Sequence, residues 1–363
     1  MPLLTLFLIG AASTYLLTGF VIRLAKKFGF VDSPTRSHPA ILHKKPLPRA
    51  GGLGIFLGIC LSLLTLFVTD TVGFDKHLVG ILLAGFLLVV VGLADDRYDL
   101  NPYFRLFTNI AAVLIVVGAG IGIKSFTNPL GGQILLDSWR ISFVLPGSLP
   151  LLSGIHSIVV WADLFALVWI VWIMNALNWS SGIDGQLSGI AAISLATVGF
   201  VSLRSISSDQ TQVLTAALAF SASGAYLGFL PWSFYPQKIM PGYGGSTLAG
   251  FLLATLAILS GAKLATAALV LAVPIIDGVW AIVRRLWKHR SPVWGDKEHL
   301  HHQLLKRGWS IPKITFFYYF ITASLGLFAL GLDSKGKLFA IAVSAIVLMG
   351  FLLTLRRVSP SHG

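Results

Sequence analysis

Residues 78 to 94 read LVGILLAGFLLVVVGLA, and two acids, Asp95 and Asp96, follow directly. The run holds no charged side chain, and as a helix it nearly crosses the roughly 30 Å hydrocarbon core of a bilayer. The stretch therefore predicts a membrane-spanning helix that brings a pair of acids to one membrane surface.

The rest of the chain has the same apolar character. Of its 363 residues, 55% are hydrophobic and 11% are charged, and the mean hydropathy is +0.82. A soluble globule of this length needs more polar surface than that, so we expect an integral membrane protein. The single cysteine, Cys60, excludes a disulfide framework and a cluster of thiolate metal ligands. The first segment lacks a basic start, which favours a retained helix over a cleaved signal peptide.

Similar apolar stretches recur along the whole sequence. We expect an all-α fold with about 10 to 11 transmembrane helices, forming one polytopic domain over residues 1–363. The predicted spans are 2–22, 51–69, 78–94, 106–123, 158–176, 187–203, 212–231, 246–260, 264–283, 314–332 and 338–355. Between the fourth and fifth spans, alternation over residues 133–143 predicts a β-hairpin on the outer side.

The lysines and arginines fix a predicted orientation. With the N-terminus outside and the C-terminus cytoplasmic, seven of the 27 cations face outward, namely Lys76, Lys124, Arg140, Arg204, Lys263, Lys335 and Lys337. The other twenty lie in inward loops or the tail, as the positive-inside rule requires. The formal charge of +13 then reflects a membrane partner rather than nucleic acid.

Two inward loops suggest phosphate and metal chemistry. Lys44, Lys45 and Arg49 offer positive charge to a phosphate at the membrane surface, although positive-inside decoration explains them equally simply. Asp95 and Asp96 repel each other unless a cation lies beside them, and Mg²⁺ prefers such hard oxygen ligands. The alternative for the acid pair is a solvated helix end.

Two further inward segments carry small and amide side chains. Asn175 and Asn178 lie three residues apart and so share a helix face at the end of the fifth span, where they bind a ligand or cap the helix. Gly242, Gly245 and Ser246 open the eighth span, and a glycine-rich turn at a helix start can bring backbone N–H groups to a phosphate. The turn lacks the lysine of a P-loop.

The last inward loop is the most specific. It carries His299, His301 and His302 on a short helix that we expect to start at Asp296 and stop at Gly308, with His299 and His302 on one face. Three histidines also suit zinc, but no thiolate accompanies them. In a basic loop they suit diphosphate binding or support of Mg²⁺.

Taken together, these loops resemble the polyprenyl-phosphate N-acetylhexosamine-1-phosphate transferases, which start bacterial cell-wall, O-antigen and related glycans. The resemblance covers nearly the whole chain. Its residues are Asp32, Pro34, Arg36, the segment 43–52, Asp95, Asp96, Leu100, Asn175, Asn178, Asp184, Gly185, Gly242, Gly245, Ser246, Asp277, Arg284, Arg285, His299, His301 and His302. The His-x-His-His form is similar to the branch that uses UDP-GlcNAc or a related UDP-HexNAc.

The resemblance implies a Mg²⁺-dependent reaction, with Mn²⁺ as a substitute, in the cytoplasmic membrane. A polyprenyl phosphate oxygen attacks the β-phosphorus of a UDP-sugar and UMP leaves. In this scheme Asp95 activates or orients the lipid phosphate, Asp96 and Asp184 support the metal with Asp95, and the histidines hold the diphosphate. The resemblance is also compatible with a homodimer.

The sequence departs from the family pattern at two positions. The family usually has an aspartate where this chain has Tyr243, and a further aspartate where it has Ser181. A neutral phenol is a poor Mg²⁺ ligand. A catalytically inactive relative that binds polyprenyl phosphate or a partner enzyme is therefore an alternative. A third class is a transporter with Asp163 and Asp277 along its path, although the sequence shows no inverted repeat.

Overall fold

The structure is a computed structural model, and it describes residues 3–34, 45–68, 75–128, 131–145, 154–261, 263–291 and 298–357. Its helices are α1 (Leu3–Phe28), α2 (Gly51–Val68), α3 (Lys76–Tyr98), α4 (Pro102–Gly118), α5 (Val160–Trp179), α6 (Gln186–Leu203), α7 (Gln212–Ser233), α8 (Gly242–Leu259), α9 (Leu264–Val270), α10 (Ala272–Trp287), α11 (Leu300–Lys306), α12 (Ile311–Gly331) and α13 (Ser334–Arg357). Its strands are β1 (Val31–Asp32), β2 (Leu47–Pro48), β3 (Ser125–Thr127), β4 (Gln133–Leu135), β5 (Arg140–Leu145) and β6 (Gly154–Val159).

The prediction of a helical integral membrane protein is confirmed. Among the described residues, eight helices are long and apolar enough to cross a membrane, and α9 with α10 gives a ninth crossing if this pair, bent by 80°, is one span. Helices also form at 51–69 and 106–123, but their apolar parts, Gly51–Leu66 in α2 and Pro102–Gly118 in α4, are too short to qualify as crossings. The crossings that qualify by length are therefore eight to nine, against the 10 to 11 expected from hydropathy.

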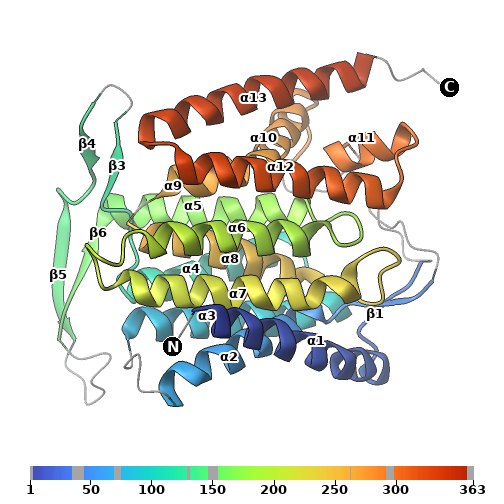
Figure 1. Ribbon diagram of the computed structural model, residues 1–363, viewed down its shortest axis with the longest axis horizontal. Helices are drawn as coiled ribbons and strands as arrows, with labels where there is room; N and C mark the ends of the chain where they lie inside the picture. The colour runs from blue at the N-terminus through green and yellow to red at the C-terminus, as the bar shows by residue number, and fades with distance from the viewer. Residues whose placement is uncertain are drawn as a thin grey trace.

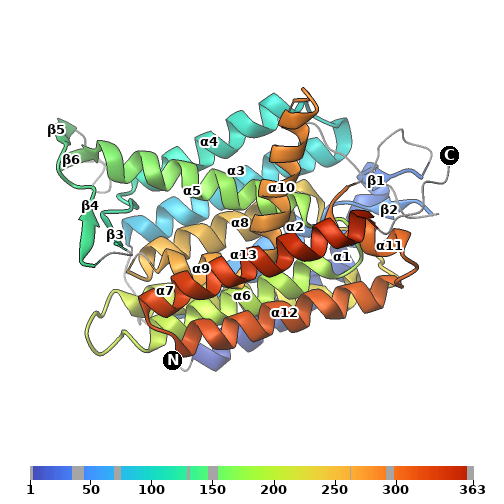
Figure 2. The same ribbon diagram turned by 90° about the horizontal axis from the view of Figure 1, so that it is seen from above.

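The long helices lie side by side in a single bundle (Figures 1 and 2). The strands β3 to β6 lie at one end, together with the start of α1, whereas α11, β1 and the end of α13 lie at the other end (Figure 1). The start of α1 and the end of α13 are thus separated by the length of the bundle (Figure 1). The side that faces the cytoplasm remains the prediction of the positive-inside rule.

The predicted hairpin over residues 133–143 is wrong in its pairing. β4 pairs with β3 and β5 pairs with β6, both antiparallel, so the alternating segment belongs to two separate ribbons. A tight turn explains the first ribbon, because Gly131 and Gly132 adopt positive φ and Asn128 N–H donates to the Gly132 carbonyl at 3.1 Å. The sequence pattern identified strand residues but not their partners.

Helix α8 lies at the centre of the bundle, and nearly all its residues are buried. Its first turn crosses α3 closely, since a Cβ on Gly92 would overlap the backbone of Gly244. Helix α3 continues to Tyr98, so Asp95 and Asp96 lie on its last turns rather than in a loop. The crossing therefore places the first residues of α8 directly beside the acid pair.

Candidate active site

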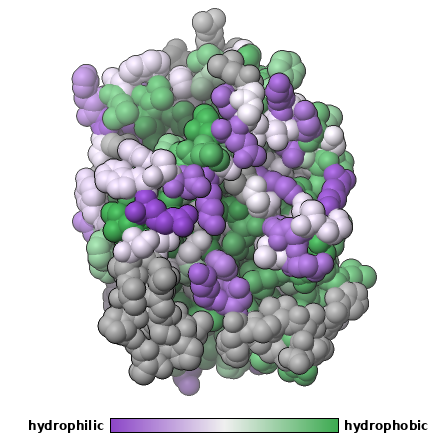
Figure 3. Space-filling view, turned by 90° about the vertical axis from the view of Figure 1, so that its left-hand side faces the viewer, coloured by the Kyte–Doolittle hydropathy of each residue, from purple (hydrophilic) through white to green (hydrophobic). Residues whose placement is uncertain are grey.

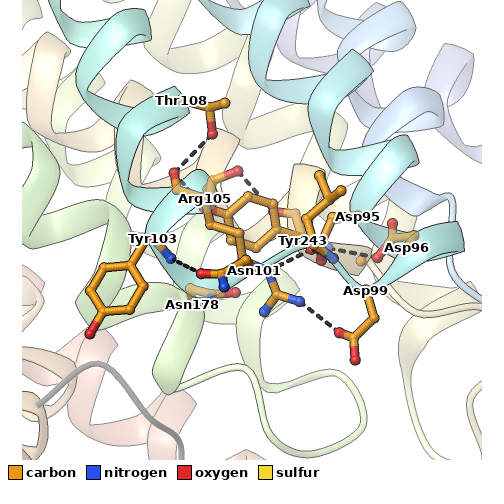
Figure 4. A network of polar contacts seen from close by, with 12 residues as sticks. Asp95, Asp96, Asp99, Asn101, Tyr103, Arg105, Thr108, Asn178 and Tyr243 are labelled. Carbon is orange, nitrogen blue, oxygen red and sulfur yellow. Dashed lines mark hydrogen bonds and ion pairs between the residues drawn. The ribbon is translucent and has the colours of Figure 1, made fainter. Parts of the chain in front are cut away.

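Asp95 is a buried carboxylate at the end of α3, with 1% of its surface exposed. Its Oδ1 accepts from Arg105 Nε at 2.5 Å and from the backbone N–H of Leu100 at 3.1 Å. The same guanidinium donates from Nη2 to Asp99 at 2.8 Å (Figure 4). The other oxygen of Asp95, Oδ2, is buried and makes no hydrogen bond. Oδ1 of this carboxylate is thus bound by an arginine, and Oδ2 has no hydrogen-bond partner.

Asp96 faces a different set of partners. Arg49 Nε lies 3.2 Å from its Oδ1, and the backbone N–H of Tyr243 donates to the same oxygen at 3.1 Å. Arg49 also reaches Asp32 at 3.5 Å, which ties the β1–β2 segment to the acid pair. Gly242, with φ of +69°, is required here because a Cβ at this position would overlap Asp96 Oδ2. The start of α8 therefore stabilises a negative charge at its N-terminus.

Tyr243 is buried between the acid pair and α4. Its hydroxyl donates to Asn109 Oδ1 at 3.1 Å, and the guanidinium carbon of Arg105 lies 5.4 Å from its ring centre (Figure 4). The phenol thus turns its oxygen toward α4 and its ring toward Arg105. This geometry makes Tyr243 a support for the arginine that binds Asp95.

Asn178 links the end of α5 to the glycine turn of α8. Its Oδ1 accepts from Ser246 Oγ at 2.6 Å, and Ser246 lies three residues after Tyr243. Asn175 behaves differently, since its Nδ2 donates to the Val171 carbonyl of its own helix at 2.8 Å. Both residues lie on α5 as predicted, and the structure brings Asn178, Gly242, Gly245 and Ser246 together beside the acid pair.

The three histidines form a second centre, at the same end of the bundle. His299 precedes α11 as its N-cap, and its Nδ1 lies 2.7 Å from Asp277 Oδ2. The other oxygen of Asp277 accepts from the backbone N–H of Leu300 at 3.0 Å. Both side chains are nearly fully buried. Asp277 therefore anchors the start of α11 to the membrane helix α10.

His301 lies deepest among the three. Its ring stacks with His299 at 5.9 Å and contacts His302 at 4.2 Å between ring centres. Burial, with His302 and His299 alongside, holds the pKa of His301 well below its ordinary value. Its Nδ1 is buried without a hydrogen bond. At neutral pH this centre therefore offers an uncharged ring.

The expected layout of the histidine helix was partly wrong. His299 and His302 were predicted to share a helix face, but His299 lies before the helix and stacks with His301. The helix ends as predicted, with Gly308 at φ of +78°. The predicted N-cap, Asp296, lies outside the described residues.

Asp184 lies in the turn between α5 and α6. Its Oδ2 accepts from the backbone N–H of Gln237 at 3.1 Å, and its carbonyl accepts from Thr315 at 2.9 Å. Next to it, Gly182 packs against the ring of His301. The segment that starts with Asn178 at the acid pair thus ends beside the histidines, so one short stretch joins the two centres.

The basic residues also divide between the acid pair and the histidines. Arg49 contacts the acid pair, and Lys45, four residues before Arg49, is exposed. Lys44 lies outside the described residues. On the histidine side, Arg284 Nε lies 3.0 Å from Glu298 and Lys288 lies 3.4 Å from the same carboxylate. Arg285 covers the ring of Trp179 at 5.6 Å. Cations therefore lie beside the acid pair and beside Glu298, the residue before His299.

The residues at the acid pair suit a divalent cation in their chemistry. Asp95 and Asp96 supply adjacent carboxylates, and the buried, unpartnered Oδ2 of Asp95 is a ready hard ligand. Across the described ranges, no group of three or more His, Cys, Asp or Glu side chains is placed to hold a metal ion. A cation here would thus rely on substrate oxygens for much of its coordination, and the ligand role of Asp184 stays a prediction.

Sequence reasoning missed two residues of the site. Arg105 was counted as an inward cation without a role, although it is the main partner of Asp95. Asn109, which accepts from the Tyr243 hydroxyl, was not predicted either. The sequence offered one clue. Arg105 and Asn109 lie one turn apart at the start of the next helix, and the short α3–α4 connection brings that turn back to the acids.

Comparison with known proteins identifies the family of the chain. The family model described as glycosyl transferase family 4 matches residues 78–261. The chain belongs to glycosyl transferase family 4. The matched region runs from α3 to the end of α8, and so contains the acid pair, the asparagines and the glycine turn.

Curated relatives of this family-4 chain match across most of its length. It is 32% identical to the decaprenyl-phosphate N-acetylglucosaminephosphotransferase of Mycolicibacterium smegmatis, over 85% of this chain and 77% of the relative. It is 29% identical to the probable undecaprenyl-phosphate N-acetylglucosaminyl 1-phosphate transferase of Bacillus subtilis, over 84% and 77%. It is 28% identical to the undecaprenyl-phosphate alpha-N-acetylglucosaminyl 1-phosphate transferase of Escherichia coli K12, over 82% and 75%. The family-4 chain is a multi-pass membrane protein.

Proposed function

We propose that the chain transfers an N-acetylhexosamine-1-phosphate, of the GlcNAc type, from a UDP-sugar to polyprenyl phosphate and releases UMP at the cytoplasmic membrane face. The names of the relatives support the substrate class. The observation that carries the proposal is the buried acid pair, in which Asp95 presents an unpartnered oxygen among arginines. Phosphoryl transfer needs such positioning and charge neutralisation more than covalent catalysis.

The reaction balances without a further reactant. An oxygen of the lipid phosphate forms a bond to the β-phosphorus, the bond from that phosphorus to the bridging oxygen breaks, and UMP leaves with the electron pair. Asp95 activates or orients the lipid phosphate by accepting a proton from that phosphate at its unpartnered Oδ2, while Arg105 and Arg49 keep the paired carboxylates in place. Mg²⁺, or Mn²⁺ in its stead, would be held by Asp95 and Asp96, with Asp184 as a further supporting acid, and would neutralise charge on the diphosphate.

The histidine centre serves the diphosphate of the nucleotide. His301 is neutral and buried, so its ring binds as a hydrogen-bonding group rather than as a cation. His299 is oriented by Asp277 from α10. His302 contacts the His301 ring and completes the cluster. Asn175 and Asn178 contribute amides at the end of α5, while Lys44, Lys45 and Arg49 attract the lipid phosphate.

The test is UMP release by the purified protein from a panel of UDP-sugars, with polyprenyl phosphate and Mg²⁺ present or chelated. We expect release with a UDP-HexNAc that stops on chelation and in Asp95→Asn. Release only in Tyr243→Asp would instead identify the wild type as a disabled transferase, the alternative in which the chain binds the lipid without turnover. In the wild type the phenol turns its hydroxyl toward Asn109 and supplies no carboxylate at this position. No release in either protein would reject the proposal.

A further inference from the structure

The ribbon formed by β5 and β6 lies at the end of the bundle that carries β3 to β6, here called the hairpin end, opposite to the acid and histidine centres (Figure 1). Its strands run across the direction of the long helices, and β6 ends at Val159, where α5 begins at Val160. If the bundle crosses a bilayer, strands at this angle lie along the membrane surface. The ribbon is thus attached directly to the outer end of a membrane-spanning helix.

The two faces of the ribbon differ in polarity. The register pairs Ile141 with Ile158, so both side chains point to one face, where they are 49% and 46% exposed. The next pair along, Ser142 with Ser157, points to the opposite face and is also exposed. On that same opposite face Val159 is buried in the main core. The isoleucine pair therefore points away from the body of the protein.

Two tryptophans extend the isoleucine pair at the base of the ribbon. Trp139 and Trp161 are 55% and 42% exposed, and their rings meet edge to face at 6.4 Å. The ladder continues here, since Val160 N–H donates to the Trp139 carbonyl at 3.0 Å. Tryptophan concentrates at the level of lipid headgroups, where its ring meets both apolar and polar surroundings.

The exposed surface continues down α5 without a break. Leu164, Phe165 and Val168 are 45%, 45% and 60% exposed on this spanning helix, which is the surface that meets lipid tails. Hydrophilic and hydrophobic side chains lie side by side over the hairpin end of the molecule (Figure 3). An isolated two-stranded ribbon is only marginally stable in water. The exposed isoleucine face therefore needs a further contact to gain burial.

We propose that the β5–β6 ribbon lies on the outer leaflet, with Ile141, Ile158, Trp139 and Trp161 inserted at the level of the lipid headgroups. The partner is the lipid surface itself. The ribbon then fixes the outer end of α5, whose other end carries Asn175 and Asn178. This inference does not depend on the proposed transferase activity.

Spin labels on single cysteines test the proposal. In a Cys60→Ser background, nitroxides are attached at Ile141→Cys and Ile158→Cys, with Ser142→Cys and Ser157→Cys as matched controls on the other face. The proteins are placed in vesicles of phosphatidylethanolamine with a minority of phosphatidylglycerol. We expect the isoleucine sites to collide with oxygen and to be shielded from a water-soluble nickel chelate, and the serine sites to collide with the chelate.

Two outcomes would overturn the proposal. Equal access of the chelate to all four sites would place both faces in water. Shielding of the isoleucine sites from both reagents would show that protein, such as a second copy of the chain, covers them. If labelling disturbs folding, the unlabelled protein is measured with lipids brominated near the headgroup. Loss of the quenched fluorescence component in Trp139→Phe supports lipid contact, and no change rejects it.

Discussion

The acid centre and the histidine centre lie at the same end of the bundle. The acids are paired with arginines, whereas the histidines are packed against one another. Asp95 and Asp96 each lie in contact with an arginine, Arg105 and Arg49 respectively. His301 lies among neighbours that would repel its charged form, and burial keeps it neutral. The comparison teaches that the acid centre depends on pairing, whereas the histidine centre depends on packing. Substitutions that remove one feature at a time can separate the two.

Loss of a charge at the acid centre should have the largest effect. Asp95→Asn leaves Arg105 without its buried anionic partner, and we expect activity to fall by about 10²- to 10³-fold and stability by about 3 kcal/mol. The matched control is Asp99→Asn, which removes the other carboxylate on the same arginine. The Asp99 side chain is 51% exposed, so we expect a change of less than about 1 kcal/mol. Assays of UMP release and thermal unfolding check both, and equal effects would contradict the pairing argument.

A packing change should damage the histidine centre next most strongly. In Gly182→Ala the new Cβ would overlap the His301 ring, so the ring must move. We expect a loss of activity of about tenfold to 10²-fold, because a displacement of about 1 Å is enough for that. Gly118→Ala is the control, since nothing lies within 4 Å of its Cβ. Wild-type activity in Gly182→Ala would show that the position of His301 is unimportant.

The pH dependence of stability should come from the histidine centre. The pKa of His301 is lowered in the folded protein, so below about pH 6.5 the unfolded chain binds a proton that the folded chain does not. Stability contributed by neutral His301 is therefore complete above about pH 6.5 and is lost as the pH falls, by up to about 1.4 kcal/mol per pH unit. Thermal unfolding at several pH values measures this slope. It should shrink in His301→Gln, and an unchanged slope would assign it to other groups.

Removal of one hydroxyl at the acid centre should have the smallest effect. Tyr243→Phe keeps the ring against Arg105 and loses the contacts of the hydroxyl with Asn109 and with the Arg105 carbonyl. We expect a cost of about 1 kcal/mol and a several-fold loss of activity. Tyr103→Phe is the control, since Tyr103 is 57% exposed. A loss as large as that of Asp95→Asn would mean that the phenol oxygen itself acts on the substrate.

Much of the fold follows from the sequence, because lipid makes long apolar runs adopt helices whatever surrounds them. Helices formed at all eleven predicted stretches, including 78–94 beside the acid pair. The bend of 80° between α9 and α10 was not foreseen, because residues 264–283 are apolar enough to count as one span, although Pro274 lies in the first turn after the break. Hydropathy measures the solvent that a segment prefers and not its direction.

The candidate site was predicted in its residue types but not in its contacts. Asp95 and Asp96 stood out because acids beside a membrane are costly without a partner. Arg105 was not recognised as that partner, and Asn178 was not linked to Ser246. These pairs join segments far apart in the chain or across a turn, and helical periodicity carries no information on them.

The sequence by itself determined that the chain lies in lipid, which segments form helices, and at which end of the bundle the charged residues gather. These properties depend on the transfer of each segment between water and lipid. Only the tertiary structure decided which cation neutralises which acid, which histidine is buried, and that the phenol of Tyr243 turns toward Asn109. The physical reason is that hydrogen bonds and ion pairs act over a few ångströms, and helix packing alone brings those side chains within that range.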